Sequence, residues 1–309
     1  MRRANASENL ARRTLTNGRG HTHFAQTEGL PLSLKCMFNG RSRYTLGRGE
    51  FCVDDRGFMV VNEGQPYTIE IASPTRVESF IFWFPSGWAE EVARSIEAPS
   101  STQLDAPDQR SRSAHEFFTR YIPADREVMP RVRAILRANK STGDLEDSWL
   151  EERLRDLLAA MLQTERGAAR EIACISAERI ATREELWRRL HRGRDFIHAN
   201  ASDEVSLSGA AQAACLSPFH FLRSFKEAFG VTPHQFLTRC RIDRAKFLLE
   251  RTAIPVTDIC LDAGFLSLGS FSTLFHRATG MAPRSWRALH AKGAAENSNI
   301  REVFLSCRR

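Results

Sequence analysis

The 309-residue sequence has no apolar run long enough to cross a membrane. Its longest compact run, Phe80-Ile81-Phe82-Trp83-Phe84, is far shorter than the roughly 20 residues of a membrane span. The Arg-rich N-terminus lacks the apolar core of a secretory signal. The seven cysteines form neither CxxC nor another metal-ligand spacing. We therefore expect no membrane anchor and a reduced, cytoplasmic environment.

The motifs of common catalytic sites are also missing. The sequence contains no GxSxG elbow, no P-loop and no GxGxxG fingerprint. The first hundred residues hold only two histidines, His21 and His23, with Glu28 after them, and the next histidine is His115. Their HxH spacing suits a metal, but the favoured interpretation is two solvated histidines. We expect no metal, no cofactor and no catalytic residue.

What the sequence does contain is a repeated segment near its C-terminus. Residues fifty positions apart match at seven places without a gap. The matched pairs are Leu216/Leu266, Ser217/Ser267, Phe221/Phe271, Phe225/Phe275, Ala228/Ala278, Gly230/Gly280 and Pro233/Pro283. Such a repeat predicts that one supersecondary unit is present twice.

Each copy carries signals for a helix. Ser217 and Ser267 are favourable N-caps, while Gly230 and Gly280 are typical helix ends. Between them, an apolar stripe at i, i+4 and i+7 predicts a buried face. The stripe consists of Phe221, Phe225 and Ala228 in the first copy and Phe271, Phe275 and Ala278 in the second.

A shorter amphipathic helix is expected before each of these helices. The first has apolar spacing at Leu207, Ala210, Ala211 and Ala214, and the second at Val256, Ile259, Cys260 and Ala263. Only residues 215–216 and 264–266 separate the helices of each pair. Two short helices joined by such a tight turn are typical of a helix-turn-helix.

The doubled unit resembles the DNA-binding domain of the AraC/XylS family of transcription regulators over about residues 183–288. The second copy carries the most recognisable part, residues 263–272 with Phe275, Gly280, Pro283 and Trp286. Two positions depart from the family: Trp286, where Tyr is more common, and Gly269, which costs the helix about 1 kcal/mol relative to Ala. The resemblance implies double-stranded promoter DNA and RNA polymerase as partners, and a homodimer.

The outer faces of the two recognition helices supply the candidate DNA contacts. The candidate base contacts are Phe219, Leu222, Arg223, Leu268, Gly269, Ser272 and Thr273. The candidate phosphate contacts are Ser217, His220, Lys226, Ser267, His276, Arg277 and Arg284. Arg223 is the best candidate for a bidentate contact to guanine. Phe219 is interpreted either as a contact to a thymine methyl or as a half-buried core residue.

Charge and spacing agree with DNA as the partner. Residues 182–290 hold 15 Lys+Arg and 10 Asp+Glu, against 29 and 27 in the rest of the chain. A helix over residues 234–251 is expected between the two units, about 27 Å long at 1.5 Å per residue. Major-groove entries on one DNA face lie ~34 Å apart, so one chain can reach two successive grooves.

The N-terminal part has a different pattern. Residues 1–20 are polar and basic and predict a disordered tail, and residues 21–97 predict short strands about ten residues apart. The expected strands are 32–36, 42–46, 51–53, 58–61, 67–71 and 77–82. The turn Asn62–Tyr67 resembles the cupin-like sensory domains that precede this DNA-binding domain in the family.

Helices are expected to follow the strands. Residues 98–165 predict a helical segment with apolar stripes at 128–136 and 149–162, which either cap the barrel or form a dimerising helix pair. Residues 166–182 predict a linker, 183–290 the DNA-binding domain and 291–309 a C-terminal tail.

The sequence therefore predicts an α+β protein: a cupin-like β-barrel with helices, then an all-α domain of two helix-turn-helix units joined by a long helix. The predicted function is sequence-specific transcription regulation, controlled by a small-molecule effector or a partner on the N-terminal domain, without enzymatic activity. Two alternatives stay open, namely a cupin-type metal enzyme with an accessory DNA-binding domain, and an architectural DNA binder without a sensing role.

Overall fold

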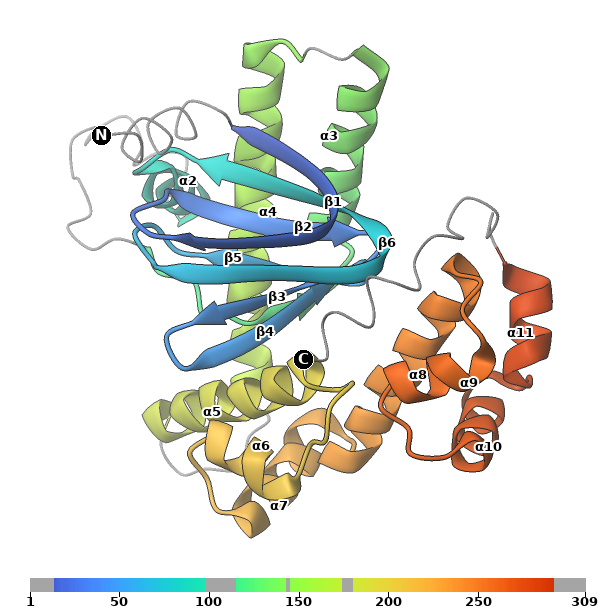
Figure 1. Ribbon diagram of the computed structural model, residues 1–309. Coiled ribbons are helices and arrows are strands. Elements are labelled where there is room, and N and C mark those ends of the chain that lie inside the picture. Colours follow the sequence, from blue (N-terminus) through green and yellow to red (C-terminus); the bar gives the residue numbers. More distant parts are fainter. Residues whose placement is uncertain (1–13, 98–114, 143–144, 174–179, 292–309) are drawn as a thin grey trace, which may run out of the picture.

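The computed structural model describes residues 14–97, 115–142, 145–173 and 180–291. A curled antiparallel sheet with helices on one side is followed by a separate group of helices, as Figure 1 shows. The predicted α+β class is confirmed. None of the helices in the described ranges has both the length and the apolar character for a bilayer crossing.

The N-terminal domain is a nearly closed antiparallel barrel built around one long strand. Its strands are β1 (Leu15–Thr27), β2 (Leu32–Phe38), β3 (Arg41–Leu46), β4 (Gly49–Asp54), β5 (Gly57–Val61), β6 (Tyr67–Phe84) and β7 (Tyr121–Pro123). The sheet order is β4-β3-β6-β2-β5-β7, and β1 pairs with β6 outside this path. The first part of β6 pairs with β3 and its last part with β2, which lets the sheet curl.

Alternating side chains on these strands divide the barrel into two cores. On β2, Leu32, Leu34 and Cys36 join the core under the helices, whereas Met37 joins the core inside the barrel. On β6, Phe82 belongs to the first core and Trp83 to the second. Both faces of the sheet are therefore apolar, because each is covered.

Three helices cover the outer face: α2 (Trp88–Glu97), α3 (Val128–Thr142) and α4 (Asp147–Ala173). Their apolar stripes are buried against the sheet of the same chain. The core residues from α3 and α4 are Val128, Met129, Val132, Ile135, Leu136, Leu154, Leu157, Leu158, Ala160, Met161 and Leu162. The stripes thus cap the barrel, and a dimer through this helix pair would need its remaining faces.

Three boundaries expected from the sequence are wrong. Residues 15–20 are not part of a disordered tail but of β1, where Leu15 pairs with Phe82 and Arg19 forms an ion pair with Glu78 at 3.1 Å. The two strands expected at 67–71 and 77–82 are the single strand β6. The short strand β7 lies in the segment expected to be helical. All three differences result from pairing between strands that are distant in the sequence, and local sequence patterns do not predict such pairing.

The expected linker is largely helical. Residues 166–173 continue α4, because Ala168 and Ile172 pack into the core of the next domain and Glu171 accepts a hydrogen bond from the Trp187 indole at 3.0 Å. The next helix, α5 (Ile180–Ala199), begins before the expected end of the linker at residue 182. Of the expected linker, residues 174–179 lie outside the described residues, as do residues 1–13 of the tail, residues 98–114 and 292–309.

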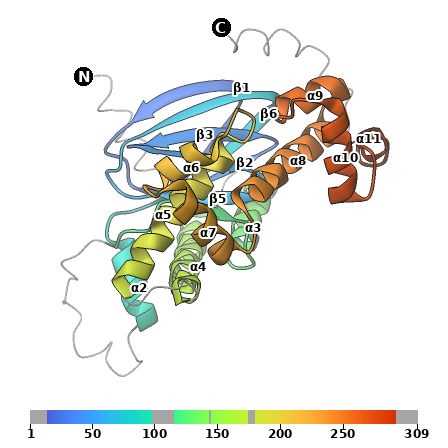
Figure 2. The ribbon, with the colours of Figure 1, turned by 90° about the horizontal axis from the view of Figure 1, so that it is seen from below.

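The C-terminal domain consists of α5 and six further helices. They are α6 (Leu207–Ala213), α7 (Pro218–Phe229), α8 (Pro233–Arg251), α9 (Val256–Asp262), α10 (Leu268–Thr279) and α11 (Pro283–His290). Two separate cores form, one around α5–α7 and one around α9–α11, and α8 contributes to both. Seen from below in Figure 2, α8 runs from the first group of helices to the second.

Candidate DNA-binding interface

The first helix-turn-helix is the pair α6 and α7. Ser217 caps α7 by accepting a hydrogen bond from the backbone N–H of His220 at 3.4 Å, and Gly230 ends the helix in the left-handed region at φ 71°. Phe221 and Phe225 are fully buried against α5, where Gly193 leaves space for the Phe221 ring. The sequence predicted both helix ends and the buried face.

The second helix-turn-helix, α9 and α10, repeats this construction. Ser267 caps α10 through the N–H of Ser270 at 3.2 Å, and Gly280 ends it at φ 76°. Phe275 lies against Trp286 with ring centroids 5.9 Å apart. Trp286 also donates from its indole nitrogen to Glu250 at 3.1 Å, so this aromatic ring fastens α11 to α8. Ala278, expected on the buried face, is exposed.

The two turns differ by one residue, which the gap-free alignment of the repeat missed. Leu216 donates its backbone N–H to Ala211, and the corresponding bond in the second unit comes from Phe265 to Cys260. Phe265 is therefore the structural equivalent of Leu216, and both enter a core. Leu266 is an additional residue and is 99% exposed, beside the N-terminus of α10.

The connecting helix α8 separates the two recognition helices. With 19 residues it is about 28 Å long. In Figure 1, α7 and α10 both lie on the lower side of the domain, towards opposite ends of α8. The length of α8 approaches the ~34 Å between successive major-groove entries.

Most of the candidate base-contacting side chains are exposed. Phe219 is 77% exposed, so the alternative of a half-buried core residue is wrong for it. Leu222 and Leu268 are exposed although apolar, Arg223 and Thr273 are exposed, and Ser272 is half-buried. Gly269 faces open space.

The candidate phosphate-contacting residues lie around the same helices. Those on the surface are Ser217, His220, Lys226, Ser267, His276, Arg277 and Arg284. In both N-cap serines the hydroxyl oxygen accepts a bond from its own helix. This leaves the hydroxyl proton of Ser217 as a donor, whereas Ser267 donates its proton to the Ser270 hydroxyl at 2.9 Å.

The surface of the helical domain that faces the barrel makes a network of polar contacts with it. The sequence did not predict these contacts. Arg43 of β3 forms an ion pair with Asp203 at 3.2 Å, and Asn200 donates to Glu50 of β4 at 2.8 Å. Further along, Arg194 donates to the Tyr121 carbonyl at 2.6 Å. The helical domain is thus docked on the β3–β4 hairpin through α5 and the loop after it.

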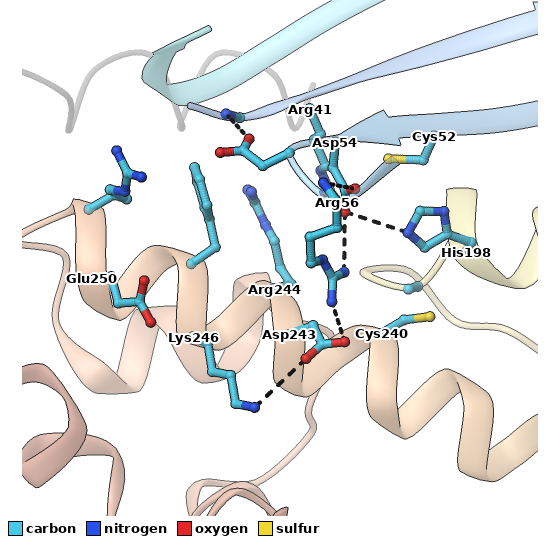
Figure 3. Close-up of a pocket in the computed structure, with 15 residues that line it drawn as sticks. Arg41, Cys52, Asp54, Arg56, His198, Cys240, Asp243, Arg244, Lys246 and Glu250 are labelled. Carbon is cyan, nitrogen blue, oxygen red and sulfur yellow. Dashed lines mark hydrogen bonds and ion pairs between the residues drawn. The ribbon is translucent and has the colours of Figure 1, made fainter. Parts of the chain in front are cut away.

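A second part of this contact involves α8. Arg56, just after β4, forms ion pairs with Asp54 and with Asp243 of α8. Burial alone would raise the pKa of the Asp54 carboxyl. The hydrogen bond and charge of His198, together with the charge of Arg56, outweigh this effect of burial, so the pKa of Asp54 lies well below its usual range. These side chains border a cavity of about 270 Å³ between the two domains, drawn in Figure 3.

No metal site accompanies these features within the described ranges. No group of three or more His, Cys, Asp or Glu side chains there is placed to hold a metal ion. His21 lies on β1 with its Nδ1 3.4 Å from the Ser73 carbonyl oxygen.

Comparison with known proteins identifies the helical domain. The helix-turn-helix domain family matches residues 210–289. The probable transcriptional regulator LumQ of Photobacterium leiognathi is 32% identical over 93 residues, 30% of this chain and 38% of LumQ. The transcriptional activator RhaS of Shigella boydii is 36% identical over 92 residues, 30% of this chain and 33% of RhaS. The chain thus matches little more than a third of these relatives.

Among solved structures, the DNA-binding domain of AdpA, a global transcriptional factor solved in complex with a target DNA, is 25% identical. The similarity covers 35% of this chain and 96% of that one, with a TM-score of 0.32.

Proposed function

We propose that this chain, which carries an AraC-type helix-turn-helix domain over residues 210–289, is a sequence-specific transcription regulator. The observation that carries the proposal is the pair of exposed recognition helices joined through α8, whose length of about 28 Å approaches one DNA turn. Each core-facing side is filled by phenylalanine, which leaves the polar and apolar outer faces free to contact bases.

The two recognition helices contact successive major grooves. The contacts to bases come from Phe219, Leu222, Arg223, Leu268, Gly269, Ser272 and Thr273, and those to phosphates from Ser217, His220, Lys226, Ser267, His276, Arg277 and Arg284. We add Leu266, because its side chain is fully exposed beside the N-terminus of α10. Apolar side chains at such positions suit the methyl group of thymine.

The N-terminal barrel controls the arrangement of the DNA-binding domain. Its hairpin β3–β4 contacts the loop after α5, and Arg56, just after β4, contacts α8. An effector or partner that changes these contacts therefore changes where α7 and α10 lie. The regulator works in the cytoplasm as a homodimer, with RNA polymerase as a further partner. It has no enzymatic activity of its own.

Selection of binding sites from a random duplex library tests the function. The purified chain should enrich two conserved blocks about one helical turn apart. Arg223→Ala should lose the preference at one base pair in one block, whereas Arg153→Ala, at a partly exposed position of α4, serves as the matched control. Enrichment of no sequence by the wild-type chain would refute the proposal and favour an architectural DNA binder.

A further inference from the structure

The cavity between the two domains is lined by charged side chains from both. The barrel contributes Arg41, Asp54, Asp55 and Arg56, and α8 contributes Asp243 and Arg244 among others. Figure 3 shows Arg244 rising from α8 towards the strands that carry Arg41 and Asp54. The volume, about 270 Å³, lies at the lower end of the range for ligand pockets, ~300–1,000 Å³, and fits a small molecule.

The acidic side chains of this cavity already have partners. Asp54 accepts hydrogen bonds from the Tyr121 hydroxyl at 2.9 Å and from Arg56 at 3.2 Å. Asp55 accepts from two backbone N–H groups at 3.1 Å. Asp243 pairs with Arg56. These carboxylates therefore already have hydrogen-bond partners, and none of them forms an ion pair with Arg41 or Arg244, although the charge of Asp54 acts on Arg244.

Two guanidinium groups in the cavity lack such a partner. Neither Arg41 nor Arg244 forms an ion pair with any side chain in the described ranges. Arg41 donates to the neutral hydroxyl of Ser202 at 3.0 Å. The Nε of Arg244 is buried and makes no hydrogen bond within the described part of the chain. Burial and the charge of Arg41 lower the pKa of Arg244 to about 9.

A guanidinium group in a cavity loses hydration, and without an ion pair it gains little in return, so its position there costs free energy. The cost is offset if an anion binds, and guanidinium groups match the two oxygens of a carboxylate or phosphate. We propose that this cavity binds a small oxyanion, a carboxylate or phosphate group of a metabolite, between Arg41 of β3 and Arg244 of α8.

Such a ligand joins the barrel to the helix that spaces the two recognition helices. Bound between β3 and α8, it stabilises the docked arrangement of the domains. This consequence for DNA rests on the proposed function, and by linkage DNA then changes the affinity for the anion by the same factor. Binding of the anion itself does not depend on any activity on DNA.

Thermal unfolding of the full chain without DNA tests the site. Sodium succinate and sodium phosphate are titrated separately, with sodium chloride keeping the ionic strength constant. We expect a saturable rise in Tm with at least one of them. Succinate alone indicates a carboxylate site, phosphate alone a phosphate site, and both a site for either oxyanion.

Two variants separate a ligand site from a structural arginine. Arg244→Met should raise Tm in the chloride buffer, because it removes a charge that forms no ion pair in the cavity. It should also raise the half-saturating anion concentration about tenfold or more. Arg41→Gln should likewise raise the half-saturating anion concentration. The control Arg153→Met, on the partly exposed surface of α4 away from the cavity, should leave the response to the anion unchanged.

Three results would overturn the proposal. They are the absence of a saturable rise with either anion, a fall in Tm for Arg244→Met in chloride, and an equal loss of response in Arg153→Met. These measurements contain no DNA. A failure of the anion site is therefore distinct from a failure of the proposed function, which the selection of binding sites from a duplex library tests.

Discussion

The two helix-turn-helix units share a scaffold but not a surface. Their buried and terminal residues repeat, as in Phe221 and Phe271 or Gly230 and Gly280. Their outer faces differ at every candidate base contact. Fifty residues apart, Phe219 corresponds to Gly269, Leu222 to Ser272, Arg223 to Thr273 and Lys226 to His276. The repeated scaffold therefore presents two different surfaces, which predicts two different half-sites in the DNA.

The units also differ in how they are held. The first is docked on the barrel through α5 and the loop after it, by contacts such as Arg43 to Asp203. The second is attached through α8 and packs beside the first at Gly264, where a Cβ atom would lie 2.7 Å from the Ala201 carbonyl oxygen. A change at the barrel therefore acts on the first unit directly and on the second through α8.

Core truncation should give the largest effect and should affect both units alike. Phe225→Ala and Phe275→Ala each remove a fully buried ring, and each should cost about 3–5 kcal/mol of unfolding free energy. Chemical denaturation measures both. An unchanged unfolding curve for either variant would show that its unit lacks the packed core described above.

The turns should respond in opposite directions. Gly264 has φ 89° and no space for a Cβ atom, so Gly264→Ala should destabilise the chain by about 1–3 kcal/mol. At the corresponding position of the first unit, Cys215 has φ 53° without being glycine. Cys215→Gly should therefore be neutral or stabilising, within about 1 kcal/mol. Denaturation of both variants checks the sign, and equal losses would contradict the correspondence of the two turns.

The outer faces should separate the units in specificity. Arg223→Ala should reduce discrimination at one base pair by about 1–3 kcal/mol. Thr273→Ala, at the matching place in α10, should act on a base pair in the other half-site, with a smaller loss because a hydroxyl makes fewer contacts than a guanidinium. Competition between specific and random duplexes measures both. Equal weakening on both duplexes would remove Arg223 from the set of base contacts.

The smallest effect is expected from a phosphate contact. Arg277→Ala should weaken binding to all sequences alike and reduce the slope of log K against log salt by about 1. A salt titration of DNA affinity with wild type and variant measures this. A sequence-dependent loss would instead assign Arg277 to base recognition.

These comparisons also show how far the sequence alone could predict the structure. The N-caps, the glycine ends and the paired phenylalanines are local signals, and each lies where the pattern places it. The longer second turn was expected at residues 264–266, but Leu266 was wrongly paired with Leu216, because the two residues are identical in an alignment without gaps. Only the backbone bond of Phe265 to Cys260 reveals the true correspondence.

Other features depend on contacts between distant segments. Strand β1 forms because β6 offers an edge, although residues 15–20 have no strand-like periodicity. The helix α4 extends into the expected linker, as far as Ala173, because the next domain buries Ala168. Likewise Arg41 and Arg244 are 203 positions apart, and only the docking of α8 on the hairpin brings them to one cavity.

The most direct test of the central claim is hydroxyl-radical footprinting of the full chain on a selected duplex. If α7 and α10 enter successive major grooves, protection should appear as two patches on one face of the duplex, about one helical turn apart. Arg223→Ala should weaken one patch more than the other. A single patch, or two patches on opposite faces, would contradict the account.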